Sequence, residues 1–480
     1  MFKKKILISA ATIALSVGAL VACGGTSKKA GTLYVCVYDG GYGTEWIDTL
    51  AKNYEASTGV HVEWEANASI LNTIENQLTG VPDFDIYMSH NINWKEYARA
   101  GLLENLDDLY ASDVKVGDST KKFEQRVVKD ALEISKLDDH YYKVCYTQGA
   151  GGFVYNVDMF EANNWEVPTT YDELSALCQT IVNADLKVGR DTVAPVAWAG
   201  GAEFYWDYVV FEWWAQLAGL DGEMGINNIK KYLGPTGKYS DGYEMYNPET
   251  YGKSFMQAYE KWYDLFAMNK NYSVANSHTN GLANAQAYFN AGKAAMIPYA
   301  QWAKNELQQA NDGNPLDFDV AMMKTPKLSA DSKDYNYNVG FGDTMLIPNK
   351  ISDDSKALAK DFLKYLATPE ACRIFVEKTQ GAFLAFDYND VQLGDLVNDT
   401  FIKSVYDKIT QCQNFNVVSP NPMAYANADA LMPWVKNTYV YAAAAANPAS
   451  ATPAIIGAQL YDIAKQNWKS WMNNAHVSDN

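Results

Sequence analysis

The sequence predicts an α/β protein of two lobes, on three observations. The chain has 480 residues, more than one hydrophobic core normally organises. Near its start, the β-rich run 33–38 is followed by the glycine turn 39–43, a helical pattern and a second strand at 60–65, an order typical of a parallel sheet. Residues 147–152 form a glycine-rich link between two strand patterns. Such a link suits a chain that crosses between lobes, although it also suits an internal loop of one lobe.

Composition and charge exclude several classes of protein. Hydrophobic residues make up 48% of the sequence and charged residues 20%, as in a folded globular protein and not in a disordered chain. The 39 basic and 57 acidic residues give a formal net charge of -18. That charge opposes binding to nucleic-acid phosphates and anionic lipid head groups, so we expect no nucleic-acid partner.

The amino terminus has the pattern of an export signal. Three lysines at 3–5 precede the apolar run 6–20, and the sequence Leu-Val-Ala-Cys-Gly-Gly follows with its cysteine at Cys23. This resembles a bacterial lipobox, so we expect a signal peptide over 1–22, a lipid on Cys23 and a polar tether over 23–30. The alternative is a plain secretion signal with a chance cysteine. The expected location is the extracellular face of the cytoplasmic membrane of a Gram-positive bacterium, and no later segment is apolar enough to span a bilayer.

The remaining cysteines and histidines predict neither a metal site nor a cofactor. Six cysteines less Cys23 leave five, at wide spacings, and the chain has five histidines. An odd count without metal-ligand spacing favours buried free thiols. The glycines of 40–43 lack the GxGxxG spacing of a nucleotide-binding loop. We therefore predict no bound metal, nucleotide or other cofactor. The five cysteines are Cys36, Cys145, Cys178, Cys372 and Cys412.

Polar residues follow the first strands of the predicted sheet. The turn after 33–38 holds Asp39, Gly41 and Tyr42, and the strand 84–88 is followed by further polar residues. Loops at the carboxyl ends of parallel strands face the crevice where α/β proteins bind ligands. We therefore predict ligand contacts in both loops, the second of which contains Ser89, His90 and Asn91.

The stretch 198–214 is the most aromatic window of the chain, and it reads as a glycine loop that feeds a helix. The helical spacing places Trp206, Val209 and Trp213 on one core-facing stripe, so core packing is the simpler interpretation of the later tryptophans. The helix start combines flat rings with carboxylates. A sugar presents C–H faces to rings and hydroxyls to carboxylates. The candidate ligand contacts here are Glu203, Phe204, Tyr205 and Trp206.

The rest of the chain alternates helices and strands. Thr170 and Glu173 have the spacing of a capping box before a helix. Residues 285–302 predict a helix end, a turn, a short buried strand and a loop that presents Tyr299 and Trp302. Further expected elements are a strand pair at 317–323 and 338–347, a helix at 355–366 and alanine-rich helices near the carboxyl terminus.

Four stretches in this order resemble the extracellular solute-binding proteins of ABC importers, in the sugar-binding branch that includes maltodextrin-binding protein. They are 38–59, Tyr-Asn-Val-Asp-Met-Phe at 155–160 with 168–174, Tyr-Phe-Asn-Ala-Gly-Lys-Ala-Ala-Met at 288–296, and 346–350 with 357–370. The resemblance implies a two-lobed periplasmic-binding-protein-like fold of type II, with crossover hinge strands and a ligand cleft. The lobes expected from it are 31–147 with 325–387 and 152–320 with 390–480.

The resemblance also implies a function and its residues. The protein would be a monomer that captures a carbohydrate, in particular an oligosaccharide, delivers it to ABC permease subunits and catalyses no reaction. Trp302 falls on the stacking tryptophan of the family, Gln148 on the first crossover, and residues 39–42 on the first binding loop. Asp343 is a further candidate contact.

Two alternatives remain open on the residues alone. The same fold could bind a peptide, a polyamine or a metal complex, because aromatics and carboxylates such as Asp39 and Asp343 also suit a cationic cargo. A secreted glycoside hydrolase would use paired carboxylates, for which Glu203 and Asp207 are candidates. Four residues apart on a helix, however, they lie side by side on one face.

Overall fold

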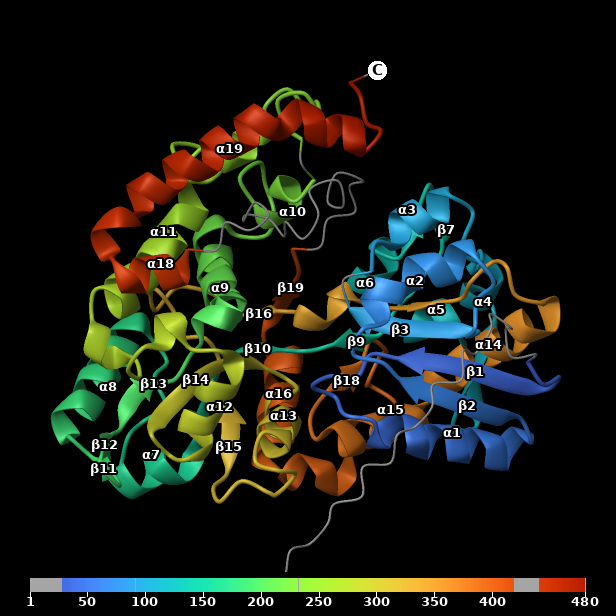
Figure 1. The fold of residues 1–480 in the computed structure, drawn as a ribbon, viewed down its shortest axis with the longest axis horizontal. Coiled ribbons are helices and arrows are strands. Elements are labelled where there is room, and N and C mark those ends of the chain that lie inside the picture. The colour runs from blue at the N-terminus through green and yellow to red at the C-terminus, as the bar shows by residue number, and fades with distance from the viewer. Residues whose placement is uncertain (1–27, 91, 232, 418–439, 480) are drawn as a thin grey trace, which may run out of the picture.

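The computed structural model describes residues 28–90, 92–231, 233–417 and 440–479. It consists of two α/β bodies that lie side by side in Figure 1, the amino-terminal one at the right. The predicted two-lobed α/β fold is therefore confirmed. The predictions on Cys23 and Asn91 fall outside the described residues.

The first lobe is built on a five-stranded sheet of order β2-β1-β3-β17-β8. β1 is parallel to β2 and β3, as the sequence predicted, whereas β17 runs antiparallel to β3 and pairs Asp343 with His90. Every residue of β1 is buried except the half-buried Tyr34, as in a central strand covered on both faces. The strands are β1 (Thr32–Val37), β2 (His61–Ala66), β3 (Ile86–His90), β17 (Asp343–Leu346) and β8 (Val144–Cys145).

Helices cover this sheet on both faces, including two that come late in the sequence (Figure 1). α1 buries the stripe Trp46, Leu50 and Tyr54, and it ends where Gly59 adopts a φ of 78°. α15 packs along α1, which returns the later chain to the first lobe. The helices are α1 (Glu45–Thr58), α2 (Ile70–Thr79), α3 (Trp94–Arg99), α4 (Asp107–Tyr110), α5 (Phe123–Arg126), α6 (Lys129–Glu133), α14 (Asp353–Leu366) and α15 (Pro369–Thr379).

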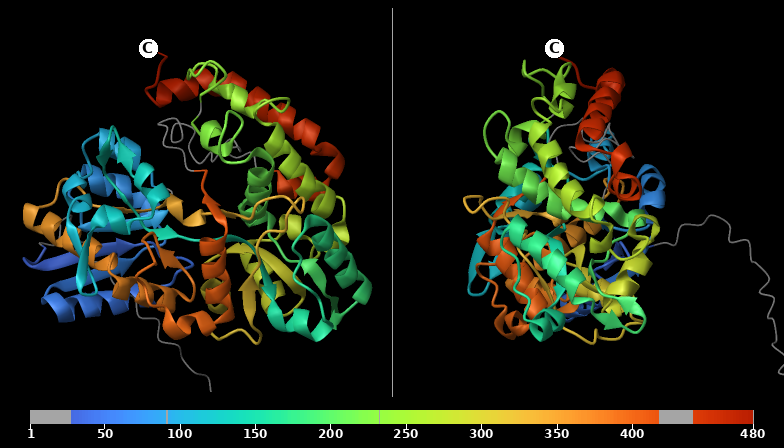
Figure 2. Two further views of the ribbon diagram at one scale, coloured as in Figure 1. Left: turned by 180° about the vertical axis from the view of Figure 1, so that it is seen from behind. Right: turned by 90° about the vertical axis from the view of Figure 1, so that its left-hand side faces the viewer.

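The second lobe is built on a four-stranded sheet of order β13-β14-β10-β15. Its central strand β14 is buried throughout. Helix α9, which is apolar on nearly every side, packs against β14. Trp213 and Trp214 of α9 are buried in the core, as predicted. Figure 2 shows from behind that α19 runs along the outer side of this lobe, against α11. The strands are β13 (Ala194–Val196), β14 (Ala294–Ala300), β10 (Gly151–Asn156) and β15 (Val320–Met322).

Side-chain caps begin four helices of the second lobe, α7, α8, α16 and α19. Thr170 accepts a hydrogen bond from the Glu173 amide in a capping box before α8, as predicted. The helices are α7 (Val157–Asn163), α8 (Tyr171–Ala184), the 3-10 helix η1 (Gly200–Trp206), α9 (Asp207–Ala218), α10 (Ile226–Ile229), α11 (Lys253–Trp262), α12 (Leu282–Asn290), α13 (Ala303–Gln309), α16 (Thr400–Gln411), α18 (Tyr441–Ala446) and α19 (Pro453–Asn474).

The chain passes between the two bodies at residues 148–151, 337–343 and 395–400. Short strand pairs flank these crossings: β9 (Thr147–Gln148) with β18 (Phe383–Leu384), and β16 (Tyr335–Tyr337) with β19 (Gln413–Phe415). The predicted pairing of 317–323 with 338–347 is wrong, because β15 belongs to the second sheet and β17 to the first.

The described residues also contain smaller two-stranded pairs, namely β4 (Asp113–Val116) with β5 (Ser119–Lys122), β6 (Lys136–Leu137) with β7 (His140–Tyr141), and β11 (Lys187–Val188) with β12 (Asp191–Thr192).

The segment around Pro326 contacts the second lobe, because Trp213 Nε1 donates to the Pro326 carbonyl at 2.9 Å. Asp390 instead pairs with Lys121 and Arg126 of the first lobe. Residues 325–387 were expected in the first lobe and residues 390–480 in the second. Pro326 and Asp390 therefore each contact the lobe opposite to the expected one.

Candidate functional site

The crossing at 148–151 is held by side chains of the neighbouring crossing. The Gly149 amide donates to Asn338 Oδ1 at 3.0 Å, and its carbonyl accepts from Asn336 Nδ2 at 3.0 Å. Gln148 donates to the carbonyls of Leu384 and Phe386 at 3.1 and 2.6 Å. The structure therefore gives Gln148, a predicted ligand contact, a role in tying the hinge strands together.

Tyr42, from the glycine loop of the first lobe, lies where the two bodies meet. Its hydroxyl donates to Asp343 Oδ2 at 3.0 Å, lies 3.0 Å from Thr147 Oγ1 and accepts from Gln301 Nε2 at 3.1 Å. Gln301 follows β14 of the second lobe, whereas Asp343 begins β17 of the first. One phenol hydroxyl thus joins both lobes and the hinge.

Asp343 is a desolvated carboxylate at the end of the first sheet. Burial raises the pKa of its carboxyl group above the usual value, and nearby His90, together with hydrogen bonds from Thr147 and Tyr42, opposes the rise. The Thr147 hydroxyl donates to it at 2.8 Å. Since an ionised carboxylate can accept about four hydrogen bonds, Asp343 has capacity left for a hydroxyl or amine of a ligand.

Trp302 is the side chain that the second lobe contributes to this site, opposite Tyr42 and Asp343 of the first lobe. It precedes α13 as its N-cap residue, and its Nε1 donates to the Tyr205 hydroxyl at 3.1 Å. Its ring centroid lies 5.9 Å from that of Tyr42 and 6.2 Å from that of Tyr208, both nearly edge-on. A Cβ atom on Gly41 would lie 2.7 Å from Trp302 Cδ1, so the first-lobe loop touches the indole through bare backbone. We call Gly41, Tyr42, Trp302, Tyr205 and Asp343 the seam cluster.

Tyr205 of the seam cluster is stacked with two further aromatic rings, Phe204 and Tyr299. The Tyr205 ring lies 4.6 Å from Phe204 on one side and 4.6 Å from Tyr299 on the other, at angles of 26° and 25°. Phe204 is 39% exposed, whereas Tyr299 is fully buried. The Tyr299 hydroxyl donates to Glu306, whose pKa is raised by burial. Phe204 therefore offers an open ring face, and Tyr299 supports the stack from below.

Two predicted contacts in η1, just before α9, do not face the seam cluster. Trp206 is fully buried and lies 4.6 Å from Phe266, centroid to centroid, in the core of the second lobe. Glu203 Oε2 accepts from the Ala442 amide at 2.6 Å, at the start of α18. The partner carboxylate of the hydrolase alternative, Asp207, accepts from the Tyr441 hydroxyl of the same helix. Both carboxylates are thus engaged in fixing α18.

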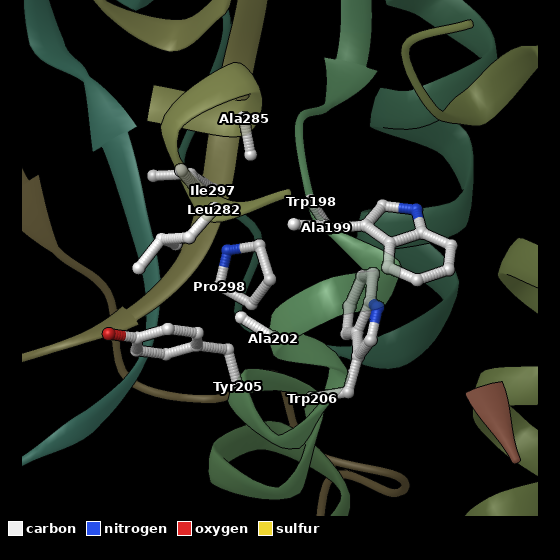
Figure 3. Close-up of a pocket in the computed structure, with 9 residues that line it drawn as sticks. All are labelled: Trp198, Ala199, Ala202, Tyr205, Trp206, Leu282, Ala285, Ile297 and Pro298. Atoms are coloured by element: carbon white, nitrogen blue, oxygen red, sulfur yellow. The ribbon is translucent and has the colours of Figure 1, made fainter. Parts of the chain in front are cut away.

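A small cavity lies between the Tyr205 ring and the indole of Trp206 (Figure 3). Its volume is about 10 Å³, room for a single water molecule. Apart from Tyr205, its walls are apolar or indole groups, and Figure 3 shows the Tyr205 hydroxyl pointing away from it. A sugar therefore cannot bind beneath the Tyr205 ring.

The second predicted loop of the first lobe lies near Asp343. His90 contacts the Tyr38 ring edge-on, with centroids 4.3 Å apart. Ser89 is buried in β3, where its hydroxyl has no hydrogen-bond partner among the described residues. Asp39 is exposed at the end of β1. The structure brings His90 to the edge of the seam cluster and turns Ser89 into the sheet.

Sequence reasoning missed several residues at the seam, notably Thr147, Tyr208, Gln301 and Glu306. Tyr208 lies three residues after Tyr205, opposite the core stripe of the same helix, and that spacing was the available signal. Thr147 begins β9 beside Gln148, Gln301 follows β14 beside Trp302, and Glu306 lies within α13, about one turn after Trp302. Only the three-dimensional pairing singles them out.

The described residues contain no group of three or more histidine, cysteine or acidic residues arranged to hold a metal ion. The five cysteines of this part are buried free thiols, as predicted, and burial raises the pKa of Cys36 and Cys372 to about 12. None of the helices described is both long enough and apolar enough to span a bilayer.

In the part of the chain that the structure describes, two α/β lobes, three crossings and an aromatic and carboxylate cluster between the lobes define a two-lobed binding protein. The comparisons with known proteins agree: the chain belongs to the family of bacterial extracellular solute-binding proteins, whose model matches residues 40–371. Members of this family bind solutes outside the cell.

Two curated relatives come from Streptomyces coelicolor. The diacetylchitobiose binding protein DasA is 28% identical over 243 residues, which cover 47% of this chain and 53% of DasA. The diacetylchitobiose binding protein NgcE is 26% identical over 152 residues, 31% of each chain. The matches thus span about half or less of these relatives.

Solved structures share the fold over nearly the whole chain. Apo RafE from Streptococcus pneumoniae aligns with a TM-score of 0.63 and 17% identity, over 92% of this chain and 99% of RafE. The GacH receptor of Streptomyces glaucescens aligns with a TM-score of 0.61 and 16% identity, over 92% and 99%. RafE has been solved in complex with raffinose and GacH with acarbose.

Proposed function

We propose that this protein is the substrate-binding lipoprotein of an ABC importer, and that its cargo is a carbohydrate, in particular an oligosaccharide. The observation that carries the proposal is the seam cluster, where an indole, phenol rings and a desolvated carboxylate meet between two hinged lobes. Rings for C–H faces and a carboxylate for hydroxyls are what a saccharide requires. Relatives named for diacetylchitobiose and neighbours solved with raffinose or acarbose support the same cargo class.

The proposed mechanism follows from the groups at the seam. Trp302 supplies a ring for stacking, Asp343 accepts hydrogen bonds from sugar hydroxyls, and the exposed ring of Phe204 can extend the contact to a further sugar unit. Each charge-assisted hydrogen bond strengthens as the lobes exclude water. A cargo that contacts both lobes binds the closed form better than the open one, and so shifts the hinge toward closure. Of the other predicted contacts, His90, Tyr42 and Tyr205 border this site.

The proposed setting is the outer face of the cytoplasmic membrane, with a monomer held by a lipid on Cys23. The first described residue, Lys28, forms an ion pair with the buried Asp85 at 2.7 Å, which fixes the folded end of the tether on the first lobe. One acyl chain gives only marginal membrane binding, so we expect more than one. Tethering keeps the cargo near the permease subunits that receive it.

Titration calorimetry against N-acetylated chito-oligosaccharides, raffinose-type sugars and acarbose tests the cargo class. We expect at least one saccharide to bind, and Trp302→Ala to weaken it by tenfold or more, because burying a large apolar side-chain surface contributes roughly 1.5–3 kcal/mol. Trp471→Ala on the outer helix α19 is the matched control, which should leave affinity unchanged. Binding of a peptide, a polyamine or a metal complex, without any sugar response, would refute the carbohydrate assignment.

Two further measurements test the rest of the proposal. Chromatography of an oligosaccharide incubated with the protein should show unchanged chain lengths, and shortened products would indicate a hydrolase. Mass spectrometry of protein from its native membrane should show acyl groups on the peptide that begins at Cys23. A free or absent Cys23 in the membrane fraction would contradict the lipid anchor.

A further inference from the structure

Helix α13 of the second lobe presents a row of amide side chains to the first lobe. Asn305 Nδ2 donates to the Gly41 carbonyl at 2.7 Å. Gln380, the C-cap residue of α15 in the first lobe, donates to Gln308 Oε1 at 2.7 Å and lies 3.5 Å from Asn305 Oδ1. With Trp302 at the N-cap, these side chains make one face of the helix, at intervals of about three residues.

The loop that Asn305 contacts is held from below by its own lobe. The Gly43 amide donates to the Gly40 carbonyl at 2.9 Å, which closes a tight turn. The Gly43 carbonyl accepts from Trp46 Nε1 of α1 at 3.0 Å. The turn is therefore fixed on α1 through Gly43, while the Gly41 carbonyl faces the second lobe.

We propose that Asn305 is a positioning residue, which holds the glycine loop against Trp302 and so keeps the lobes together before cargo arrives. Both amide atoms of Asn305 meet first-lobe groups, the Gly41 carbonyl and the Gln380 amide. The same contact sets Gly41 against the indole. Asn305 thus acts on the seam through the loop, without touching the cargo itself.

The chemistry of the contact suits a reversible clasp. All three side chains are neutral amides, so added salt screens the contact little compared with an ion pair. A neutral hydrogen bond contributes little net free energy because water competes for both partners. Removing it should change the ratio of open to closed protein by roughly five- to tenfold, enough to shift the hinge without unfolding either lobe.

The test uses Asn305→Asp, which keeps the shape and turns the donor nitrogen into an oxygen that repels the Gly41 carbonyl. Asn305→Ala removes the contact without repulsion. Asn311→Asp is the matched control, since the Asn311 amide donates only within the second lobe, at 3.3 Å to Asn314 and 3.1 Å to Pro315.

The first readout is the distance between spin labels on the two lobes, at exposed positions 52 of α1 and 180 of α8. Cysteines are introduced there as Lys52→Cys and Thr180→Cys in a Cys23→Ser chain, whose other thiols are buried. Without any sugar, the open population should rise five- to tenfold in Asn305→Ala and further in Asn305→Asp. It should be unchanged in Asn311→Asp. Equal distance distributions in all four proteins would overturn the proposal.

The second readout rests on the proposed function. For whichever saccharide binds, Asn305→Ala should raise the dissociation rate about five- to tenfold at an unchanged melting temperature. A lower melting temperature with unaltered distances would show a purely structural role and overturn the proposal. If no sugar binds but the distances shift, the proposed role of Asn305 is supported and the carbohydrate assignment is refuted.

Discussion

A buried ion pair beside the hinge allows the sharpest stability prediction. Lys408 Nζ of α16 lies 3.0 Å from Glu212 Oε2 of α9, and both side chains are at most 1% exposed. The same ammonium donates to the Gly151 carbonyl at 2.6 Å, while Glu212 Oε1 accepts from the Tyr337 amide at 2.8 Å. The pair therefore joins two helices to two of the crossings.

The perturbation is Lys408→Met, which keeps the aliphatic stem and removes the charge. It leaves Glu212 buried without its cation and the Gly151 carbonyl without this donor. Breaking a buried pair from one side costs about 3–5 kcal/mol of unfolding free energy. The same substitution at Lys403, an exposed lysine of α16 paired with Asp407, should cost no more than about 0.5 kcal/mol.

The cost should depend on pH. Burial raises the pKa of Glu212 above its usual value, and Lys408 opposes the rise. Without Lys408 the folded-state pKa rises further. At pH values between the pKa of Glu212 in the unfolded state and its pKa in the folded state, the native protein binds more protons than the unfolded protein. The free energy of unfolding of the variant therefore falls as pH rises through this range. The gap between Lys408→Met and the parent protein should therefore widen from pH 5 to pH 8.

Urea unfolding, followed by circular dichroism at both pH values, measures these differences. The double variant Glu212→Gln with Lys408→Met completes a double-mutant cycle with the two single variants. Its free energy of unfolding should exceed that of Lys408→Met alone, because no unpaired buried carboxylate remains. A loss below about 1 kcal/mol for Lys408→Met, or a loss that is equal at pH 5 and pH 8, would refute the account of a buried, mutually dependent pair.

Three further substitutions probe the hinge, the seam and a cap. Gly149→Ala places a Cβ atom 1.8 Å from Gln301 Oε1, and we expect a loss of about 1–3 kcal/mol in urea unfolding; a neutral effect would mean that Gln301 moves freely. Tyr42→Phe removes a donor from the half-buried Asp343, which should cost about 1–3 kcal/mol and raise the Asp343 pKa further, as seen by carboxyl NMR titration; an unmoved pKa would contradict the contact. Thr170→Ala removes the α8 cap and should cost about 1 kcal/mol while cargo affinity, measured by calorimetry, stays constant.

Local patterns predicted the elements of the fold well. The βαβ order near the amino terminus, the capping box at Thr170 and the buried stripe of α9 all depend on residues a few positions apart. The segment 338–347 was harder. Asn338 caps the 3-10 helix η6 (Val339–Gly342), and only the four residues that follow form β17. A crossing strand must bend between two sheets, and no periodicity in one strand reveals that bend.

The site was predicted only where a pattern marked it. The glycine turn indicated Gly41 and Tyr42, and the loop after a buried strand, with the family resemblance, indicated Trp302. The structure brings these residues together. Glu203 has the same local appearance as a ligand contact, yet it caps a helix 239 positions away. Local sequence cannot separate a carboxylate that faces a ligand from one that faces a distant backbone amide, because both need polar partners and partial burial.

Gly149 of the hinge crossing and Gly41 of the seam cluster are required for the same physical reason. Gly149 leaves room for Gln301, and Gly41 leaves room for Trp302, the next residue along the chain. Consecutive residues after β14 therefore fill gaps in the hinge crossing and in the first-lobe loop. A shift of the backbone at 301–302 must disturb both contacts at once, so the hinge and the proposed stacking residue are mechanically coupled. We accordingly expect the costs of Gly149→Ala and Gly41→Ala to be non-additive in a double-mutant cycle, because a single displacement of this backbone relieves both clashes.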